Sequence, residues 1–457
     1  MPLLCRCLIL TILTAVVGLT AQPGAKPRLL VLTDIGGDPD DTQSLIRLMT
    51  YSNEFDIEGL IASAAGTPGE LGVDIVKPEL IREVVEAYGR VCGTLSLHAA
   101  GYPPVERVLD CIKSGNPKRG VGQLGHDKDT EGSRWIIKLA DRPDPRPLNI
   151  AIWGGSTELA QALWRVRNDC GRDGLNRFVG RLRVHSIAHQ DDTGPWIIAN
   201  FPELFYVLSM EPDGVDRRQG AYRGMYLGGD ESLTSLDWVN AHVKTDHGPL
   251  GALYPLKTWT APNPHGVLKE GDTPSWFYFL PNGLGDPEHP EWGGWGGRFR
   301  RASGRLYRDA QDSTASVTDA RATVWRWRPA YQNDFQARMD WCVKGYREAN
   351  HPPLVVLDSK PGRDVVRKQT RPGANVPLNA AGSSDPDGDH VSYRWWIYRE
   401  AGRLSEQAVI ERAERERATV RIPSGSAGAE IHVILEATDS GAPPLISYRR
   451  MILDVRP

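Results

Sequence analysis

The sequence lacks the patterns that mark several common kinds of functional site. It contains no Cys-x-x-Cys pair, and its histidines do not have the spacing of zinc ligands, which argues against a zinc site. The glycine-rich stretch 293–297 does not follow a strand-like run, so it is not a dinucleotide-binding fingerprint. Ser156 lacks the flanking residues of a nucleophile elbow, which argues against a serine hydrolase.

The chain also lacks a strong excess of either charge and has no long apolar run beyond its first residues. Its formal net charge is -3, and 24% of its 457 residues are charged. This balance does not point to a nucleic acid or to an anionic membrane as partner. No segment past the N-terminal one is long and apolar enough to cross a membrane. The length allows two or three domains with a sizeable core.

Residues 1–21 have the features of a secretory signal peptide. Arg6 supplies a positive charge, residues 8–17 form a short apolar core, and Ala21 is a small residue suited to cleavage. We therefore predict a soluble protein that is exported to the periplasm or the cell exterior. In that oxidising compartment the four remaining cysteines either form two disulfides, in one of three pairings, or stay buried as free thiols. These cysteines are Cys92, Cys111, Cys170 and Cys342.

Strand-like and helix-like segments alternate through residues 22–350. After the apolar run 29–32, helical spacing predicts a helix over 42–51 and another over 77–88, with Gly89 just past the end of the second. This β-α-β-α order predicts an α/β domain whose mostly parallel sheet is covered by helices on both faces.

Residues 351–457 have a different character, which places a domain boundary near residue 350. Short β-rich runs alternate with turns there, and roughly seven short strands over about 100 residues are typical of an immunoglobulin-like β-sandwich. Five runs can be identified, and the gaps between them leave room for two more strands. The runs are 354–357, 391–398, 418–422, 431–437 and 446–455.

Four carboxylates follow the first apolar run within eight residues. They are Asp34, Asp38, Asp40 and Asp41. In open α/β sheets, ligands bind outside the carboxyl ends of the strands. Carboxylates this close repel one another unless a proton or a cation lies between them. An oxygen-only set of ligands favours calcium or magnesium. The alternative is a solvated loop in which one of the acids caps the following helix.

The segment Leu32–Asp41 resembles the N-terminal metal motif of nucleoside hydrolases. Three later segments are similar to that family in the same order: 59–67, 153–160 and 247–253. The chain as a whole is most similar to secreted cellulose-binding proteins with a nucleoside hydrolase-like domain and a C-terminal β-sandwich, which share the Asp-Asp-Thr-Gly-Pro-Trp segment at 191–196. The resemblance implies a nucleoside hydrolase-like α/β fold followed by an immunoglobulin-like sandwich.

The resemblance also implies roles for individual residues. Asp34 would bind a divalent metal, calcium by preference, and act as the base for water. Asp38 and Asp41 would be further metal ligands, and Asp40 would hold sugar hydroxyls. His247 matches a late family motif, which makes it the second catalytic candidate, although a structural histidine is the alternative. A cation that lowers the pKa of its water beside a carboxylate base is consistent with glycosidic cleavage.

Two departures from the family pattern concern the metal. The chain has two extra residues between Asp34 and the Asp pair, and it has Gly248 where nucleoside hydrolases carry a metal-binding Asp. Either the metal shell is incomplete, or Asp38, Asp246 or Asp272 completes it.

Several substrate-binding candidates each have a structural alternative. Asp191 and Asp192 fit a surface turn as well as a sugar contact, and Glu270 and Asp272 fit a helix cap as well as a site wall. Tryptophan rings in the Gly-rich and Pro-rich stretch 263–300 either belong to the core or offer apolar platforms for sugar rings. The candidates are Asp40, Asp191, Asp192, Asn200, Glu270, Asp272, Trp153 and Trp292.

Taken together, the motifs favour metal-assisted hydrolysis of a glycosidic bond in a saccharide, combined with binding of a cellulose-like polysaccharide. Two alternatives stay open. In one, the fold binds polysaccharide without catalysis, as the Gly248 departure suggests; in the other, the protein is a nucleoside N-ribohydrolase.

Overall fold

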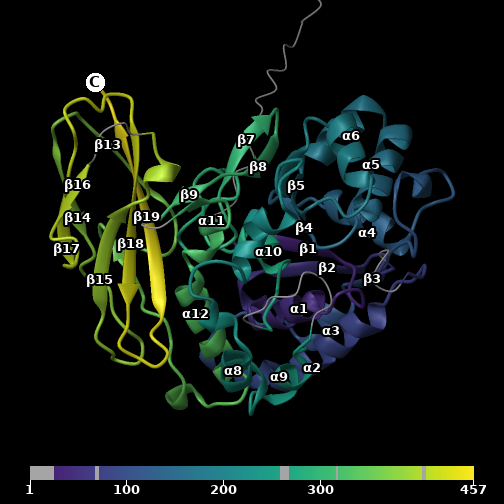
Figure 1. Cartoon of the computed structure of the whole chain (residues 1–457), viewed down its shortest axis with the longest axis horizontal. Helices are drawn as coiled ribbons and strands as arrows, with labels where there is room; N and C mark the ends of the chain where they lie inside the picture. Colours follow the sequence, from purple (N-terminus) through teal and green to yellow (C-terminus); the bar gives the residue numbers. More distant parts are fainter. Residues whose placement is uncertain (1–24, 67–71, 258–266, 315–316, 404–407) are drawn as a thin grey trace, which may run out of the picture.

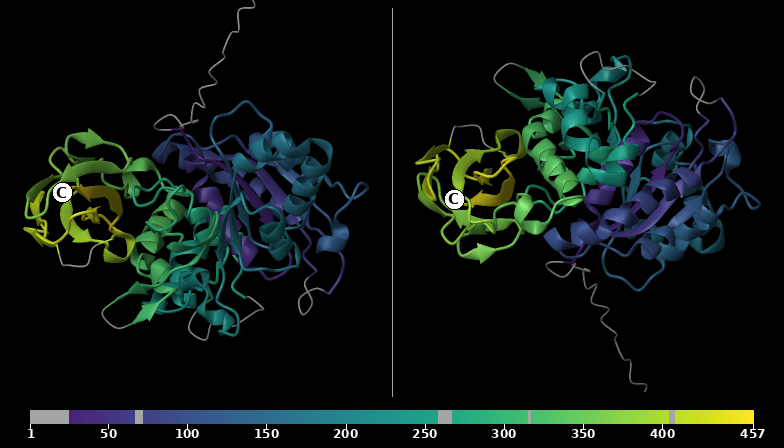
Figure 2. Two further views of the ribbon diagram at one scale, coloured as in Figure 1. Left: turned by 90° about the horizontal axis from the view of Figure 1, so that it is seen from above. Right: turned by 90° about the horizontal axis from the view of Figure 1, so that it is seen from below.

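The computed structural model describes residues 25–66, 72–257, 267–314, 317–403 and 408–457 (Figure 1). The predicted signal peptide lies outside the described residues. Within them, no helix combines the length and apolar character needed to cross a bilayer. The chain forms an α/β domain with a β-sandwich beside it, and the two views of Figure 2 show the sandwich on one side of the α/β domain.

An eight-stranded sheet organises the α/β domain, in the order β3-β2-β1-β4-β5-β6-β8-β7. Strands β7 and β8 are antiparallel to each other, and the other neighbouring pairs are parallel. The predicted mostly parallel sheet is confirmed. The strands are β1 (Arg28–Thr33), β2 (Asp56–Ala62), β3 (Ile112–Ser114), β4 (Leu148–Ile152), β5 (Leu182–Ile187), β6 (Phe205–Ser209), β7 (Phe299–Ser303) and β8 (Leu306–Asp309).

Helices cover both faces of this sheet because its central strands are apolar on both sides. In β1, Leu29 and Val31 pack into one core, and Leu30 and Leu32 pack into the other. The first core is completed by α1 (Asp40–Thr50), α2 (Pro78–His98), α9 (Gly248–Leu253), α10 (Thr273–Phe277) and α12 (Arg328–Trp341). The second is completed by α4 (Glu131–Ala140), α5 (Thr157–Asp169), α6 (Gly171–Gly180) and α7 (Thr193–Asn200).

Helix α2 is longer than predicted. It begins at Pro78, as the sequence indicates, but it continues through Gly89 to His98. Gly89 does not end the helix; it lies against Val105 at the start of α3 (Val105–Leu109), where a Cβ atom would come within 2.8 Å of a Val105 methyl carbon. The absence of a side chain at Gly89 therefore allows α2 and α3 to pack closely against each other.

The C-terminal part forms the two facing sheets of a β-sandwich, with strand orders β13-β19-β18-β15 and β14-β17-β16. Four of the five identified runs are strands of these sheets. The run at 354–357 instead contributes β11 (Val356–Leu357), which pairs with β12 (Lys360–Pro361) outside both sheets. The predicted boundary at residue 350 stays a prediction. The sandwich strands are β13 (Val366–Thr370), β14 (Asn375–Asn379), β15 (Ser392–Ile397), β16 (Val409–Glu411), β17 (Arg417–Arg421), β18 (Glu430–Thr438) and β19 (Ile446–Val455).

Hydrogen-bonded side chains connect the sandwich to the α/β domain. Asp387 of the sandwich lies 2.9 Å from Nδ1 of His351, whose Nε2 lies 2.9 Å from Nδ1 of His98 at the end of α2. Elsewhere, Tyr398 of the sandwich donates a hydrogen bond to the buried carboxylate of Asp312 at 2.5 Å. These contacts fix the sandwich against the α/β domain.

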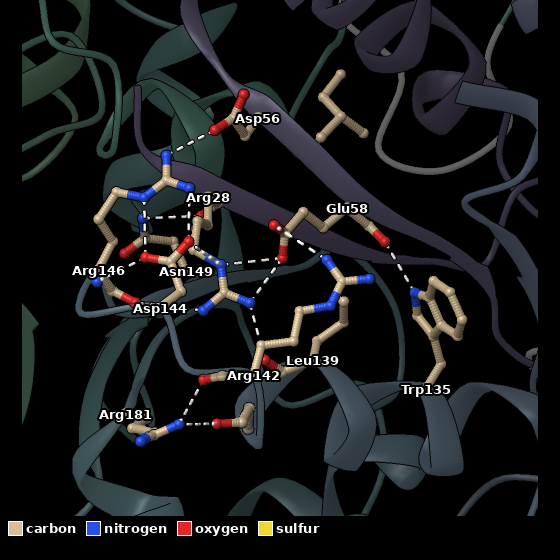
Figure 3. A network of polar contacts seen from close by, with 12 residues as sticks. Arg28, Asp56, Glu58, Trp135, Leu139, Arg142, Asp144, Arg146, Asn149 and Arg181 are labelled. Atoms are coloured by element: carbon tan, nitrogen blue, oxygen red, sulfur yellow. Dashed lines mark hydrogen bonds and ion pairs between the residues drawn. The ribbon is translucent and has the colours of Figure 1, made fainter. Parts of the chain in front are cut away.

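A network of arginines and carboxylates occupies the amino ends of β1, β2 and β4 (Figure 3). Arg28 bonds Glu58 at 2.7 Å, and Arg146 bonds both Asp56 and Asp144, at 2.6 and 2.7 Å. Each of these acids has a guanidinium partner, so arginines of the protein itself neutralise the negative charge at this end of the sheet. The acids predicted to form the site lie at the opposite, carboxyl ends of the strands.

Cys92, Cys111, Cys170 and Cys342 are all free thiols. Burial raises the pKa of the Cys111 thiol to about 11. Of the two sequence-based interpretations, the structure supports free thiols rather than two disulfides, but only Cys111 and Cys342 are buried; Cys92 is partly buried and Cys170 is exposed.

A buried histidine is expected to make the folded protein less stable in acid. His185 in β5 is fully buried, its ring nitrogens have no hydrogen-bond partner in the part of the chain that the structure describes, and Tyr278 and Phe299 meet the ring edge-on. Burial lowers the pKa of His185 from 6.5 to about 3. The unfolded chain therefore binds a proton that the folded chain excludes, and stability present above pH 6.5 is lost as the pH falls toward 3, by roughly 4 kcal/mol.

Urea denaturation of the wild type and of a His185→Leu variant between pH 7 and pH 4 measures this loss. We expect the variant to lose less stability over the range than the wild type. Equal losses in both proteins would show that another group causes the acid sensitivity.

Candidate functional site

A cavity of about 410 Å³ opens at the carboxyl end of β1, and we call it the acid pocket. Loops that follow several strands of the sheet contribute to it, as expected for a binding site in an open α/β sheet. Six carboxylates line its wall: Asp34, Asp38, Asp40, Asp41, Glu211 and Asp272. The structure thus brings together the four clustered acids of the sequence and one from the later Gly-rich segment.

The local fold turns the first acids inward. Asp34 directly follows β1, and Gly36 adopts φ +97, a conformation that side chains other than glycine rarely take. Thr33 donates a hydrogen bond to Asp41 at the start of α1. Asp34 and Asp41 are only 4% and 3% exposed, and no side chain caps α1. The alternative of a solvated capping loop is therefore wrong.

Two basic residues form ion pairs with Asp34 and Asp38. The guanidinium of Arg119 donates to Oδ2 of Asp34 at 2.5 Å and also to the carbonyl of Ala64. The ammonium of Lys269 donates to Oδ2 of Asp38 at 2.5 Å. Asp34 and Asp38 therefore meet protein cations in this structure.

Three of the acids form a cluster of their own. Asp40, Asp41 and Asp272 each place a carboxylate oxygen within 4.8 Å of the other two. Burial, followed by repulsion between neighbouring carboxylates, raises the pKa of Asp41 and of Asp272 well above the ordinary value. Among the described residues, the buried Oδ2 atom of Asp272 has no hydrogen-bond partner. Three carboxylate oxygens this close together fit a hard divalent cation such as calcium or magnesium.

The remaining walls combine apolar and polar groups suited to an organic ligand. Trp153 is fully buried at the pocket, where its indole N–H donates to Ser275 at 2.9 Å and its carbonyl accepts from Gln190. Tyr222 and Tyr226 line the same cavity. Flat aromatic rings beside carboxylates are what a sugar ring requires, since it has apolar faces and hydroxyl edges.

His247 lies apart from the acid pocket. It lines another hollow, where its Nε2 is 3.3 Å from Asp340 of α12 and its Nδ1 donates to the carbonyl of Thr245. Asp246 lines that hollow too, so it is not placed to complete the metal shell. Gly248, with φ +70, begins helix α9 on the far side of this turn. The matched sequence motif therefore does not place His247 beside Asp34, and Asp272 offers the carboxylate that Gly248 cannot.

Glu270 has a structural role in place of the predicted substrate contact. It is fully buried and forms an ion pair with Arg47 of α1. Tyr254 and Thr273 also donate hydrogen bonds to its carboxylate, at 2.6 and 3.0 Å. Every one of these contacts is internal, so Glu270 holds the segment that carries Lys269 and Asp272.

Four other predicted substrate contacts do not line the acid pocket. Asp191 accepts hydrogen bonds from Thr193 and Thr157, and Asp192 accepts one from the backbone of Val121. Both support loops next to the pocket.

Asn200 lies on the surface at the end of α7, where it bonds Arg167 at 3.1 Å. Trp292 is 3% exposed and stacks on His289 at the junction with the sandwich, so it is not an exposed sugar platform. The ring belongs to the packing between the domains.

Sequence reasoning missed Arg119, which bonds Asp34, and basic and aromatic residues that line the pocket, including Arg217, Tyr222, Arg223, Tyr226 and Lys269. Lys269 directly precedes Glu270-Gly271-Asp272, and a cation beside acids was a usable signal. Arg119 lies in a loop with no local motif, so only the fold brings it to Asp34, 85 residues away in the sequence.

Comparisons with known proteins agree with this architecture. The family model for a cellulose-binding Sde182, nucleoside hydrolase-like domain, matches residues 28–299, and that for the cellulose-binding protein Sde0182, C-terminal domain, matches residues 375–455. A search of curated proteins returns no match.

Among solved structures, a nucleoside hydrolase-related hypothetical protein from Saccharophagus degradans that is associated with carbohydrate metabolism is 32% identical to this chain. The match covers 94% of this chain and 100% of that one, with a TM-score of 0.79. The PKD domain from the KIAA 1837 protein is 20% identical over 20% of this chain and 78% of its own length, but its TM-score of 0.16 is too low to inform the fold.

Proposed function

The chain belongs to the family of cellulose-binding proteins with a nucleoside hydrolase-like domain, and from that premise we propose that it binds a cellulose-like saccharide in the acid pocket and hydrolyses a glycosidic bond there with the help of a divalent cation. Export through the predicted signal peptide would bring the protein to such a polysaccharide.

The observation that carries the proposal is the cluster of Asp40, Asp41 and Asp272. Three carboxylate oxygens lie within 4.8 Å of one another in a cavity large enough for a sugar residue. Among the described residues, the buried Oδ2 atom of Asp272 has no partner, and leaving a buried polar group without one is costly. A divalent cation held by these oxygens would supply Lewis-acid polarisation of water and of sugar hydroxyls.

The residues of the chain would divide the remaining work. Asp34 has one carboxylate oxygen held by Arg119, which fixes the orientation of the group, and it would take the proton of the attacking water. Asp40 would accept hydrogen bonds from sugar hydroxyls. Tyr222 and Tyr226 would exclude water from the apolar face of the sugar. Negative charge around the anomeric carbon favours its oxocarbenium-like transition state.

Calcium titration of the Asp272→Asn variant tests the cation site. The substitution keeps the size of the side chain and removes one negative charge, so we expect calcium affinity, measured by calorimetry, to fall at least about tenfold. Asp173→Asn, at an exposed acid in α6, is the matched control and should leave the affinity unchanged. Equal affinity in the wild type and in Asp272→Asn, or no binding of calcium or magnesium to the wild type, would contradict the proposed site.

A second candidate function is polysaccharide binding without catalysis. The Arg119–Asp34 ion pair favours it, because the guanidinium occupies an oxygen of the proposed base. An assay for soluble sugar released from cellulose-like glycans separates the two functions. Release that depends on Asp34 supports hydrolysis, whereas glycan binding with no release supports the second candidate.

A further inference from the structure

A second cavity, of about 430 Å³, lies where the α/β domain meets the sandwich, and we call it the interdomain cavity. Helix α1 separates it from the acid pocket: Asp40 and Asp41 begin the helix at one site, and Tyr51 follows its end at the other. An 11-residue helix spans roughly 16 Å. The two cavities are therefore distinct, and cavities of this size at domain junctions are common places for ligands.

The charged groups of the interdomain cavity neutralise one another. Arg338 bonds Asp334 at 2.7 Å and contacts Glu54 at 3.4 Å, and Arg363 from the sandwich side bonds Glu54 at 2.6 Å. Two guanidinium groups thus face two carboxylates. A charged ligand would have to break these pairs, so the wall favours an uncharged one.

One hydrogen-bond donor on the wall has no partner among the described residues. The side-chain amide nitrogen of Asn282 is buried without an acceptor, whereas the indole N–H of Trp295 meets the hydroxyl of Tyr448. The Asn282 carbonyl oxygen is already occupied, because it accepts from the backbone of Leu284 at 3.2 Å. A fitting ligand must therefore bring acceptor oxygens, which hydroxyl and ether groups supply.

The rest of the wall is largely apolar and comes from both domains. Tyr51 and Leu280 belong to the α/β side, and Tyr448 and Ile446 belong to β19 of the sandwich. Leu354, 64% exposed, lies at the same cavity. Aromatic and aliphatic surface combined with a neutral donor matches the faces and edges of a sugar ring.

We propose that the interdomain cavity is a second saccharide-binding site, which takes a short, uncharged, polyhydroxylated segment and needs no metal ion. This inference does not depend on hydrolysis in the acid pocket. Because both domains line the cavity, a bound saccharide contacts the α/β domain and the sandwich at once. The protein would thus hold a polysaccharide chain at a point away from the acid pocket.

Calorimetric titration of the full chain with cellotetraose, in the presence of a chelator, tests the proposal. The chelator removes the cation-dependent contribution of the acid pocket. We expect binding to persist, and the Ser384→Trp variant, which places a large ring at an exposed residue of the cavity wall, to weaken it at least tenfold. Ser392→Trp, at an exposed serine of β15 outside the cavity, is the matched control and should bind like the wild type.

A second variant tests the unpaired donor. Asn282→Asp keeps the oxygen that accepts from Leu284 and removes the amide N–H, so we expect cellotetraose to bind about five- to tenfold more weakly. No binding under chelator, or equal binding by Ser384→Trp and the wild type, would overturn the proposal. In the Asp272→Asn variant the interdomain cavity should bind unchanged, so failure of the acid pocket and failure of this second site give different results.

Discussion

In the Glu270→Ala variant, the free energy of unfolding is expected to fall by about 3–5 kcal/mol, because the guanidinium of Arg47 would be left buried without its carboxylate. Arg47 and Glu270 are both 0% exposed. Arg47 also lies over the ring of Phe335, 3.8 Å from its centroid, which prevents a simple escape to solvent. Urea denaturation followed by circular dichroism measures the loss.

The matched control is Glu411→Ala, which removes the acid of an exposed pair with Arg421. The side chains of that pair are 42% and 63% exposed, and exposed ion pairs contribute only about 0–1 kcal/mol. A similar loss of unfolding free energy in the two variants would show that burial does not determine the effect of removing the acid. The structural role assigned to Glu270 would then be wrong.

The same substitution should disturb the acid pocket, because Glu270 anchors its neighbours. Glu270 adopts φ +27, an uncommon conformation for a residue with a side chain. Lys269 and Asp272, on either side of it, face the acid pocket. Calcium affinity in Glu270→Ala should therefore fall together with stability, whereas in Asp272→Asn it should fall without a comparable loss of stability.

The main elements of the fold could be predicted from local sequence because apolar periodicity decides them. The run 29–32 is buried on both faces, as an uninterrupted apolar strand should be, and β19 spans the predicted residues 446–455. Prediction failed where tertiary contacts override local signals. Gly89 is a helix-ending residue by local rules, but its contact with α3 keeps it inside α2.

The candidate site also combines residues that local sequence identifies with residues that only the fold brings together. Asp34, Asp38, Asp40 and Asp41 were found because one strand and one turn present them together. Other partners come from far away in the sequence: the Lys269 ammonium meets Asp38 across 231 residues.

The predictions that failed depended on structure that a local motif does not contain. The Trp292 ring contacts His432 and Arg450 of the sandwich, which lie much later in the sequence. His247 matches a motif whose position relative to Asp34 depends on how α9 is placed against α12. A short sequence motif contains no information on contacts between domains or on how two helices pack against each other.

The Asp34→Asn variant should show the largest loss of activity. If Asp34 takes the proton of the attacking water, its amide cannot do so, and the rate of sugar release should fall by about 10²–10⁴-fold. The amide still fits beside Arg119 and Ala64, so affinity for the saccharide should change little. Reducing-sugar assays combined with calorimetry on the same glycan measure the two quantities separately, and Asp173→Asn is again the control.

The Arg119→Gln variant gives the companion result that decides between hydrolysis and binding alone. If Arg119 orients the Asp34 base, its loss should lower sugar release while saccharide binding persists. If the ion pair instead keeps Asp34 from taking part in catalysis, the wild type releases no sugar, and the variant gains calcium affinity because a competing cation has been removed from the pocket. The direction of change in these two measurements therefore assigns the pair of Arg119 and Asp34 to one function or the other.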